Sequence, residues 1–131
     1  MAGEFLSDNV LDFGLDYIAT DIGDAALRVD ICHTQAPVSY AEATSTYTCG
    51  NEQDITTTGP ANGTTSGRKI TIDAITVGDV TATQTAGWWA LTDGSSILIA
   101  VGPLASTQAV TSGNTFTLTA IEIEIPDVVV S

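Results

Sequence analysis

From Arg68 onward, apolar side chains alternate with threonine and acidic side chains along most of the chain. A period of two places the apolar residues on one face of a strand and the polar residues on the other. Threonine suits the exposed face because its β-branched side chain favours extended backbone, and the chain holds 21 threonines. The sequence therefore predicts a mainly β fold, an antiparallel β-sandwich or barrel-like domain with one short N-terminal helix.

Two of the expected strands change parity part-way along. In the stretch that begins at residue 68, the apolar positions shift after Ala74, from Ile70, Ile72 and Ala74 to Ile75 and Val77, and in residues 114–125 they shift after Ala120. A bulge or a bend is expected at the first of these changes because one residue of slip moves every later side chain to the other face. By contrast, residues 51–67 show no such pattern and are expected to form a long polar loop.

Two adjacent tryptophans raise the question of what covers the second one. Residues 93–94 (Asp-Gly) predict a two-residue hairpin turn. In that register Trp88 lies on the more apolar face and is expected in the core, whereas Trp89 lies with Leu91 and Leu98 on the face that carries threonine. An indole left in water loses about 2 kcal/mol of the favourable free energy that its burial would provide. We expect the N-terminal helix, a second sheet or a neighbouring subunit to cover Trp89.

Residues 7–19 are the best helix candidate, and they divide the chain into an N-terminal helical arm, residues 1–25, and a β domain, residues 26–131. Acidic residues recur every four positions from residue 4 to residue 16, where like charges repel. This stripe can be a solvated face, a docking stripe for basic residues of a partner, or a cation site. The candidate partner interface combines the stripe with apolar residues of the hairpin: Glu4, Asp8, Asp12, Asp16, Trp89, Leu91 and Leu98.

Sixteen acidic residues face three basic ones, which gives a net charge of −13. Nucleic acids and anionic membranes are disfavoured as partners, since both require Lys and Arg on the protein. The charge is consistent with a basic surface on a partner protein and equally with a role in solubility alone. No segment approaches the roughly 18 apolar residues of a membrane-spanning helix. The first ten residues carry an acid where a secretory signal carries bases, so we expect synthesis in the cytoplasm without classical export.

The sequence has one histidine and no GxSxG, HExxH or GxGxxG pattern, so we expect no enzymatic activity, no cofactor and no metal. Glu122 and Glu124 are interpreted as solvated charges on the outward face of a strand. Cys32 lies in an alternating strand and is interpreted as a small buried hydrophobe. A disulfide between Cys32 and Cys49 and a reactive thiol are the alternatives.

Three segments together resemble a known group of proteins: "SYAEATSTYTCGN", "SGRKITIDAITVGDVTATQTAGWWALTD" and "TSGNTFTLTAIEIEIPD". Over roughly residues 26–127 the chain is similar to small proteins encoded among the structural genes of tailed bacteriophages that infect alphaproteobacteria. The resemblance implies a virion component that assembles in the host cytoplasm.

Three functions are consistent with these features. The favoured one is a capsid decoration (cement) protein, a homo-oligomer that binds the major capsid protein or another virion protein on the outer shell. The alternatives are a structural protein of the tail or the head–tail connector, and a host-facing glycan-binding module. Copy number in the particle separates the first two.

Overall fold

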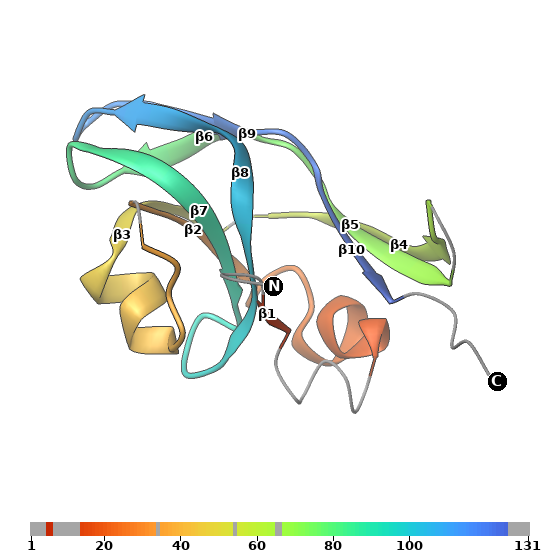
Figure 1. Ribbon diagram of the computed structural model, residues 1–131. Coiled ribbons are helices and arrows are strands. Elements are labelled where there is room, and N and C mark those ends of the chain that lie inside the picture. Colours follow the sequence, from red (N-terminus) through yellow and green to blue (C-terminus); the bar gives the residue numbers. More distant parts are fainter. Residues whose placement is uncertain (1–4, 7–13, 34, 54, 65–66, 126–131) are drawn as a thin grey trace, which may run out of the picture.

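A computed structural model describes residues 5–6, 14–33, 35–53, 55–64 and 67–125. Its strands are β1 (Phe5–Leu6), β2 (Arg28–Cys32), β3 (Thr48–Glu52), β4 (Thr57–Asn62), β5 (Arg68–Ile72), β6 (Ile75–Val80), β7 (Gln84–Thr92), β8 (Leu98–Val110), β9 (Thr115–Leu118) and β10 (Ile121–Ile125). They form a seven-stranded sheet in the order β1-β8-β7-β2-β3-β6-β9 and a three-stranded sheet in the order β10-β5-β4 (Figure 1). The mainly β prediction is confirmed.

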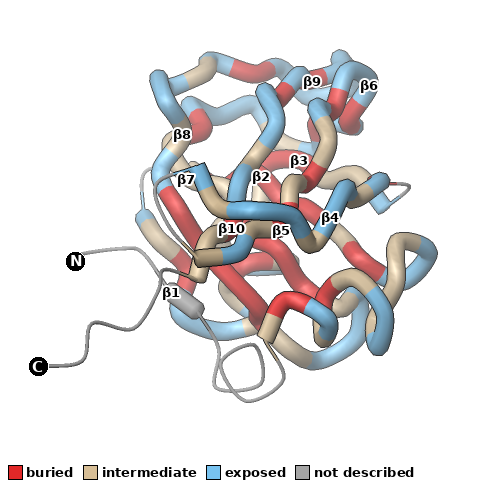
Figure 2. The backbone as a smooth tube through the Cα atoms, turned by 90° about the vertical axis from the view of Figure 1, so that its right-hand side faces the viewer, coloured by how far each residue is buried: buried red, intermediate tan, exposed pale blue. Residues whose placement is uncertain are grey.

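The larger sheet is strongly curled, and the smaller sheet lies beside its open side (Figure 1). Residues of both sheets contribute to one apolar cluster, here called the main core, whose strand residues include Val29, Ile31, Ile70, Ile72, Leu91, Ile99, Phe116 and Ile123. Figure 2 shows buried backbone in the interior and mostly exposed backbone in the second part of β8, after Gly102. The fold is therefore held by packing one face of the curled sheet against the inner face of the small sheet.

Two pairs of strands run from one sheet into the other. Ile72 pairs with Ile121 in the three-stranded sheet, while Ile75 pairs with Leu118 in the seven-stranded sheet. The segments β5–β6 and β9–β10 therefore lie side by side and cross between the sheets together, forming what we call the bent ribbon. The crossings fall close to the changes of parity in the sequence, and the expected bend is confirmed, since β5 ends at Ile72 and β6 begins at Ile75. After each strand turns, Ile75 and Ile123 lie in the main core. Val77 was expected on the same face as Ile75 but is exposed, because the pairing of β6 with β9 shifts between Ile75 and Gly78.

The helical candidate is described only from residue 14 onward, and its first part lies outside the described residues. Helical backbone runs over residues 15–22 and includes η1 (Tyr17–Ile22), a wide helical turn. Leu15 and Ile18 are buried in the main core. This segment therefore shares the core of the strands.

The polar loop expected over residues 51–67 is wrong in part, because β3 extends to Glu52 and Thr57–Asn62 forms β4. Among the described strands, β4 pairs with β5 alone and lies at the edge of the small sheet. Most of its residues are exposed or half-buried, so no apolar alternation is needed to form it. A strand of this kind has no period-two signal in the sequence.

Candidate functional site

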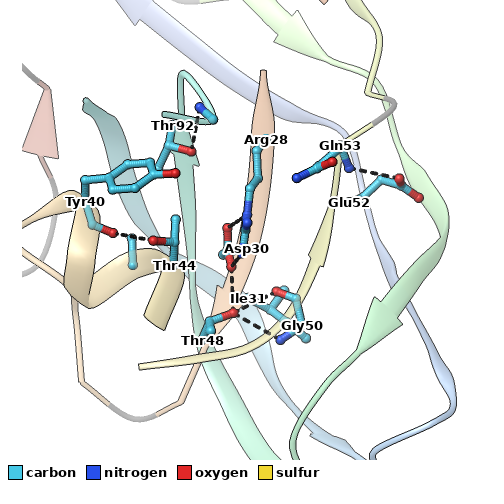
Figure 3. A network of polar contacts seen from close by, with 12 residues as sticks. Arg28, Asp30, Ile31, Tyr40, Thr44, Thr48, Gly50, Glu52, Gln53 and Thr92 are labelled. Carbon is cyan, nitrogen blue, oxygen red and sulfur yellow. Dashed lines mark hydrogen bonds and ion pairs between the residues drawn. The ribbon is translucent and has the colours of Figure 1, made fainter. Parts of the chain in front are cut away.

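Asp30 is a carboxylate with no exposed surface, near the centre of β2 (Figure 3). Its neighbours Val29 and Ile31 belong to the main core, so Asp30 points to the opposite, outer face of the curled sheet. Arg28 donates two hydrogen bonds to it, from Nε to Oδ1 at 2.7 Å and from Nη2 to Oδ2 at 2.9 Å. The hydroxyl of Thr48 on β3 donates a third to Oδ2 at 2.6 Å. Both carboxylate oxygens are thus engaged.

The hydrogen bond from Thr48 links the Arg28–Asp30 ion pair of β2 to the neighbouring strand β3. Burial raises the pKa of Asp30, and the hydrogen bonds from Arg28 and Thr48 oppose that rise. The hydrogen bond to Asp30 in turn raises the pKa of Arg28. A buried charge that loses its partner is strongly destabilising, so Arg28 is required to keep Asp30 charged where Thr48 of β3 binds it. The Asp30 carboxylate has no exposed surface from which to exchange a proton with a ligand.

Thr92 is the other fully buried polar residue of the described chain. It lies opposite Arg28 in the pairing of β2 with β7, and its hydroxyl accepts a hydrogen bond from the Gly94 amide at 3.2 Å. Within the described residues, every buried side-chain nitrogen or oxygen has a hydrogen-bond partner. These buried polar groups are accounted for by the fold itself.

Both cysteines are buried and unpaired, which confirms the interpretation of Cys32 as a small buried hydrophobe. Cys32 belongs to an apolar cluster on the outer face, here called the outer cluster, and Cys49 belongs to the main core. The sheet therefore separates the two sulfurs, and no disulfide joins them. Burial raises the pKa of both thiols, that of Cys49 to about 11. A thiol with a raised pKa is a poor nucleophile at neutral pH.

All three basic residues of the chain bind acceptors within it. Besides the pair made by Arg28, Lys69 Nζ lies 2.6 Å from Glu122 Oε2, on the exposed face of the small sheet. The hydrogen bond from Lys69 lowers the pKa of Glu122. Arg68 donates to Asn62 Oδ1 at 3.0 Å and to the Pro60 carbonyl at 3.2 Å. The remaining carboxylates therefore give the protein a strongly negative surface.

The acidic stripe is described at one of its four positions. Asp16 is exposed, and Glu4, Asp8 and Asp12 lie outside the described residues. The interpretation of this stripe as a docking surface stays a prediction.

The apolar members of the candidate interface do not form one exposed surface. Leu91 is fully buried in the main core, and Leu98 is buried in the outer cluster. Trp89 is half-buried and packs against the main core. Leu91 and Leu98 are therefore not available to a partner in this conformation.

The assignment of the two tryptophans to the two faces is wrong. Trp89 faces the main core, where its indole lies over Gly102, and Trp88 packs against the outer cluster. The pairing of β7 with β8 is irregular between Ala86 and Trp88, because Ala86 pairs with Gln108 whereas Trp88 pairs with Pro103. This irregularity inverts the parity of the residues that follow. A glycine inside a strand pattern is itself a signal for a bulge, and it was the available clue.

The predicted two-residue turn is also wrong. Thr92 pairs with Leu98, so residues 93–97 form a longer loop, and a further shift between Leu91 and Thr92 places Trp89 opposite Gly102. The Asp93 carboxylate holds that loop by accepting hydrogen bonds from the amides of residues 95, 96 and 97 at 2.9–3.0 Å. Burial opposes ionisation of Asp93, yet these amide donors hold its pKa below the ordinary value.

A second helical turn, η2 (Glu42–Thr46), covers the outer cluster and was not predicted. The Ser39 hydroxyl accepts from the Glu42 amide at 3.1 Å, and the Glu42 carboxylate accepts from the Val38 amide at 2.9 Å. This reciprocal arrangement resembles a capping box, and the spacing Ser-x-x-Glu was its sequence signal. Tyr47 at the end of η2 packs edge-on against His33, with ring centroids 5.1 Å apart.

The described ranges contain no group of three or more His, Cys, Asp or Glu side chains placed to hold a metal ion. They also contain no helix long and apolar enough to cross a membrane. The chain matches no protein-family model, and comparisons with curated proteins and with solved structures gave no significant match.

Proposed function

We propose that the chain is a structural protein of a bacteriophage virion, a capsid decoration protein that binds the outer shell in many copies. Its partner is a basic surface of the major capsid protein or of another virion protein. The observation that carries the proposal is that every basic side chain already binds an acceptor of the same chain. Arg28 binds Asp30, Lys69 binds Glu122, and Arg68 binds neutral oxygen atoms. The resemblance to phage structural proteins supplies the class of particle.

This charge arrangement favours docking by complementarity. The net charge is −13, and the basic side chains are already held by acceptors of the same chain. A surface of one sign attracts and orients a partner of the opposite sign. Each exposed ion pair contributes little, so attachment must be collective, and many copies on one shell let modest contacts accumulate.

The placement of the reactive groups supports a binding role. Cys32, Cys49 and Asp30 are all buried, and each contributes to strand packing or pairing. The side chains that could be chemically reactive thus serve stability instead, which suits a protein whose task is to persist on a particle.

The test of location is the copy number of the chain in purified particles, measured by quantitative mass spectrometry. A decoration protein is expected at a number comparable to that of the major capsid protein. A number that corresponds to a single ring would contradict decoration and favour the tail or connector, and absence from the particle would overturn the virion proposal.

The test of attachment removes charge from the acidic stripe. The variant Asp8→Asn, Asp12→Asn, Asp16→Asn is added to particles at low and at high salt, and bound protein is quantified. We expect lower occupancy at low salt and a weaker salt dependence than in the native chain, because surface charges act collectively and are screened. The control is Asp21→Asn with Asp79→Asn, which are both exposed positions outside the stripe. Native occupancy at both salt concentrations returns the stripe to a solvated face.

A further inference from the structure

We propose that Asn62 is a site of spontaneous covalent modification. Its side-chain amide loses ammonia on attack by the backbone nitrogen of Gly63, and Arg68 both assists this step and binds the carboxylate that results. The modification goes beyond the proposed function, because it requires neither a partner nor an enzyme. Three features at the end of β4 support it: the dipeptide itself, the guanidinium group beside it, and its place at the end of the strand ladder.

The dipeptide Asn62-Gly63 provides the chemistry. The Gly63 nitrogen forms a bond to Cγ of Asn62, and the side-chain nitrogen leaves as ammonia with the proton of the Gly63 amide. The product is a five-membered succinimide ring, and water opens it to aspartate or isoaspartate. Glycine permits this attack best, since it has no Cβ in the path of approach. The other three asparagines of the chain precede Val10, Glu52 and Thr115, which are all larger.

The guanidinium group of Arg68 lies on the atom that gains charge during the attack. Arg68 is directly opposite Asn62 in the pairing of β4 with β5. Its Nη1 donates to Asn62 Oδ1 at 3.0 Å, and its Nη2 donates to the Pro60 carbonyl at 3.2 Å, which holds the group in place. A cation at a carbonyl oxygen withdraws electrons from its carbon and stabilises the negative charge that develops on the oxygen. Arg68 is therefore placed to assist the attack on Cγ.

The position of Asn62 at the end of the ladder gives the Gly63 nitrogen its freedom. Asn62 is exposed and is the last residue of β4. Beyond it, the Gly63 amide donates to the Gly67 carbonyl at 2.9 Å, and this hydrogen bond must open before the nitrogen can attack. Strand ends open locally at a much lower free-energy cost than the whole domain. The reaction therefore proceeds from the folded protein with only the end of β4 released.

The dipeptide Asp93-Gly94 offers a contrast within the same chain. The Asp93 carboxylate accepts hydrogen bonds from the amides of residues 95, 96 and 97, which keep it ionised, and an ionised carboxylate is a poor electrophile. The Gly94 amide also donates to the Thr92 hydroxyl at 3.2 Å. We expect no succinimide at Asp93, so this dipeptide serves as an internal control.

The product gives Arg68 a charged partner. In the unmodified chain Arg68 binds the neutral oxygen atoms of Asn62 and Pro60. Aspartate at position 62 places a carboxylate oxygen where the amide oxygen lies, and hydrogen bonds between ionised groups are stronger than those to neutral acceptors. The modification thus adds one negative charge to the net charge of −13 and reinforces the contact between the edge strand β4 and β5.

The first test follows the full chain during incubation at mildly alkaline pH, with peptide mapping by mass spectrometry. We expect conversion of amide to acid at Asn62, while Asn51, Asn114 and Asp93 stay unchanged. The control variant Gly63→Ala keeps Asn62 but hinders the approach of the nitrogen, so conversion should stop. Conversion no faster at Asn62 than at Asn51 would overturn the inference. Equal conversion in Gly63→Ala would overturn it as well, because it would show direct hydrolysis without the ring.

The second test examines the role of Arg68. Arg68→Gln should slow the conversion of Asn62 by about twofold to fivefold, the range that an exposed charge interaction provides. Circular dichroism of this variant verifies that it is folded. An equal or faster conversion in Arg68→Gln would contradict assistance by the guanidinium group.

The third test examines the product. Asn62→Asp should raise the equilibrium constant for folding by about twofold to fivefold at low salt in the native background, measured by urea unfolding. In the Arg68→Gln background the same change should have no such effect. An equal effect in both backgrounds would contradict binding of the new carboxylate by Arg68.

Discussion

Gly102 makes room for the indole of Trp89, and replacing it with alanine tests how tightly the main core is packed there. A Cβ atom at position 102 would lie 2.7 Å from Cζ2, 2.8 Å from Cε2 and 2.9 Å from Nε1 of Trp89. Favourable contacts between carbon atoms lie at about 3.5–4.0 Å, so the added methyl group overlaps the ring by about 1 Å. The φ angle of Gly102 is not positive, so its backbone accepts alanine.

The magnitude follows from two opposing effects. Overpacking of a filled site costs about 1–3 kcal/mol. Alanine also restricts the unfolded chain, which stabilises the fold by about 0.4–1 kcal/mol. We therefore expect Gly102→Ala to lower the free energy of unfolding by about 1–2 kcal/mol, a measurable share of the roughly 5–15 kcal/mol of an ordinary domain. In a Trp89→Ala background the overlap is gone, and the same change should be neutral or stabilising.

The assay is a double-mutant cycle by urea unfolding, followed by far-ultraviolet circular dichroism so that the signal does not depend on tryptophan. We expect a coupling free energy of about 1–3 kcal/mol between positions 89 and 102, with unchanged dependence on denaturant. If Gly102→Ala costs the same with and without the indole, the overlap is not the cause of the loss and the packing argument is wrong.

Two further changes test the loop and the thiols. Asp93→Ala should cost about 1 kcal/mol at neutral pH, since three amides lose their acceptor. The folded pKa of Asp93 lies below its ordinary value of 3.8, so this stabilisation is present above that pH and is lost as the pH falls through the folded pKa. Parallel pH profiles of unfolding for the native chain and the variant would contradict this assignment. Cys32 and Cys49 should react with a thiol reagent only as fast as the chain opens, because both are buried. Rapid labelling of either thiol in the native chain would refute their placement.

The class of fold could be predicted because most strands of this chain bury one face. Alternation after Arg68 places isoleucine and phenylalanine inward, and the parity changes around Ile75 and Ile121 coincide with the crossings between sheets. β4 could not be recognised in this way, because an edge strand with exposed side chains needs no apolar alternation. One irregularity in the pairing of β7 with β8, between Ala86 and Trp88, inverted the faces of both tryptophans. Alternation is reliable only between such irregularities.

The buried ion pair was only partly visible in the sequence. Arg28 and Asp30 are two residues apart in an expected strand, which places them on one face. Whether that face is solvated or covered depends on the Thr48 hydroxyl, which is 18 residues away in the chain, and on the η2 turn that packs against β2 and β3. Such long-range contacts leave no local periodicity. The acidic stripe, in contrast, is a purely local pattern, and its role depends on a partner.

The bent ribbon has a mechanical consequence. Because β5 continues into β6 and β10 follows directly from β9, a force applied along β10 passes through the covalent backbone into the curled sheet. A force along the axis of β10 would load the hydrogen bonds between β10 and β5 in parallel, as a shear. Hydrogen bonds that share a load withstand a larger force than bonds that open one after another. A load on β10 would thus be borne by both sheets at once.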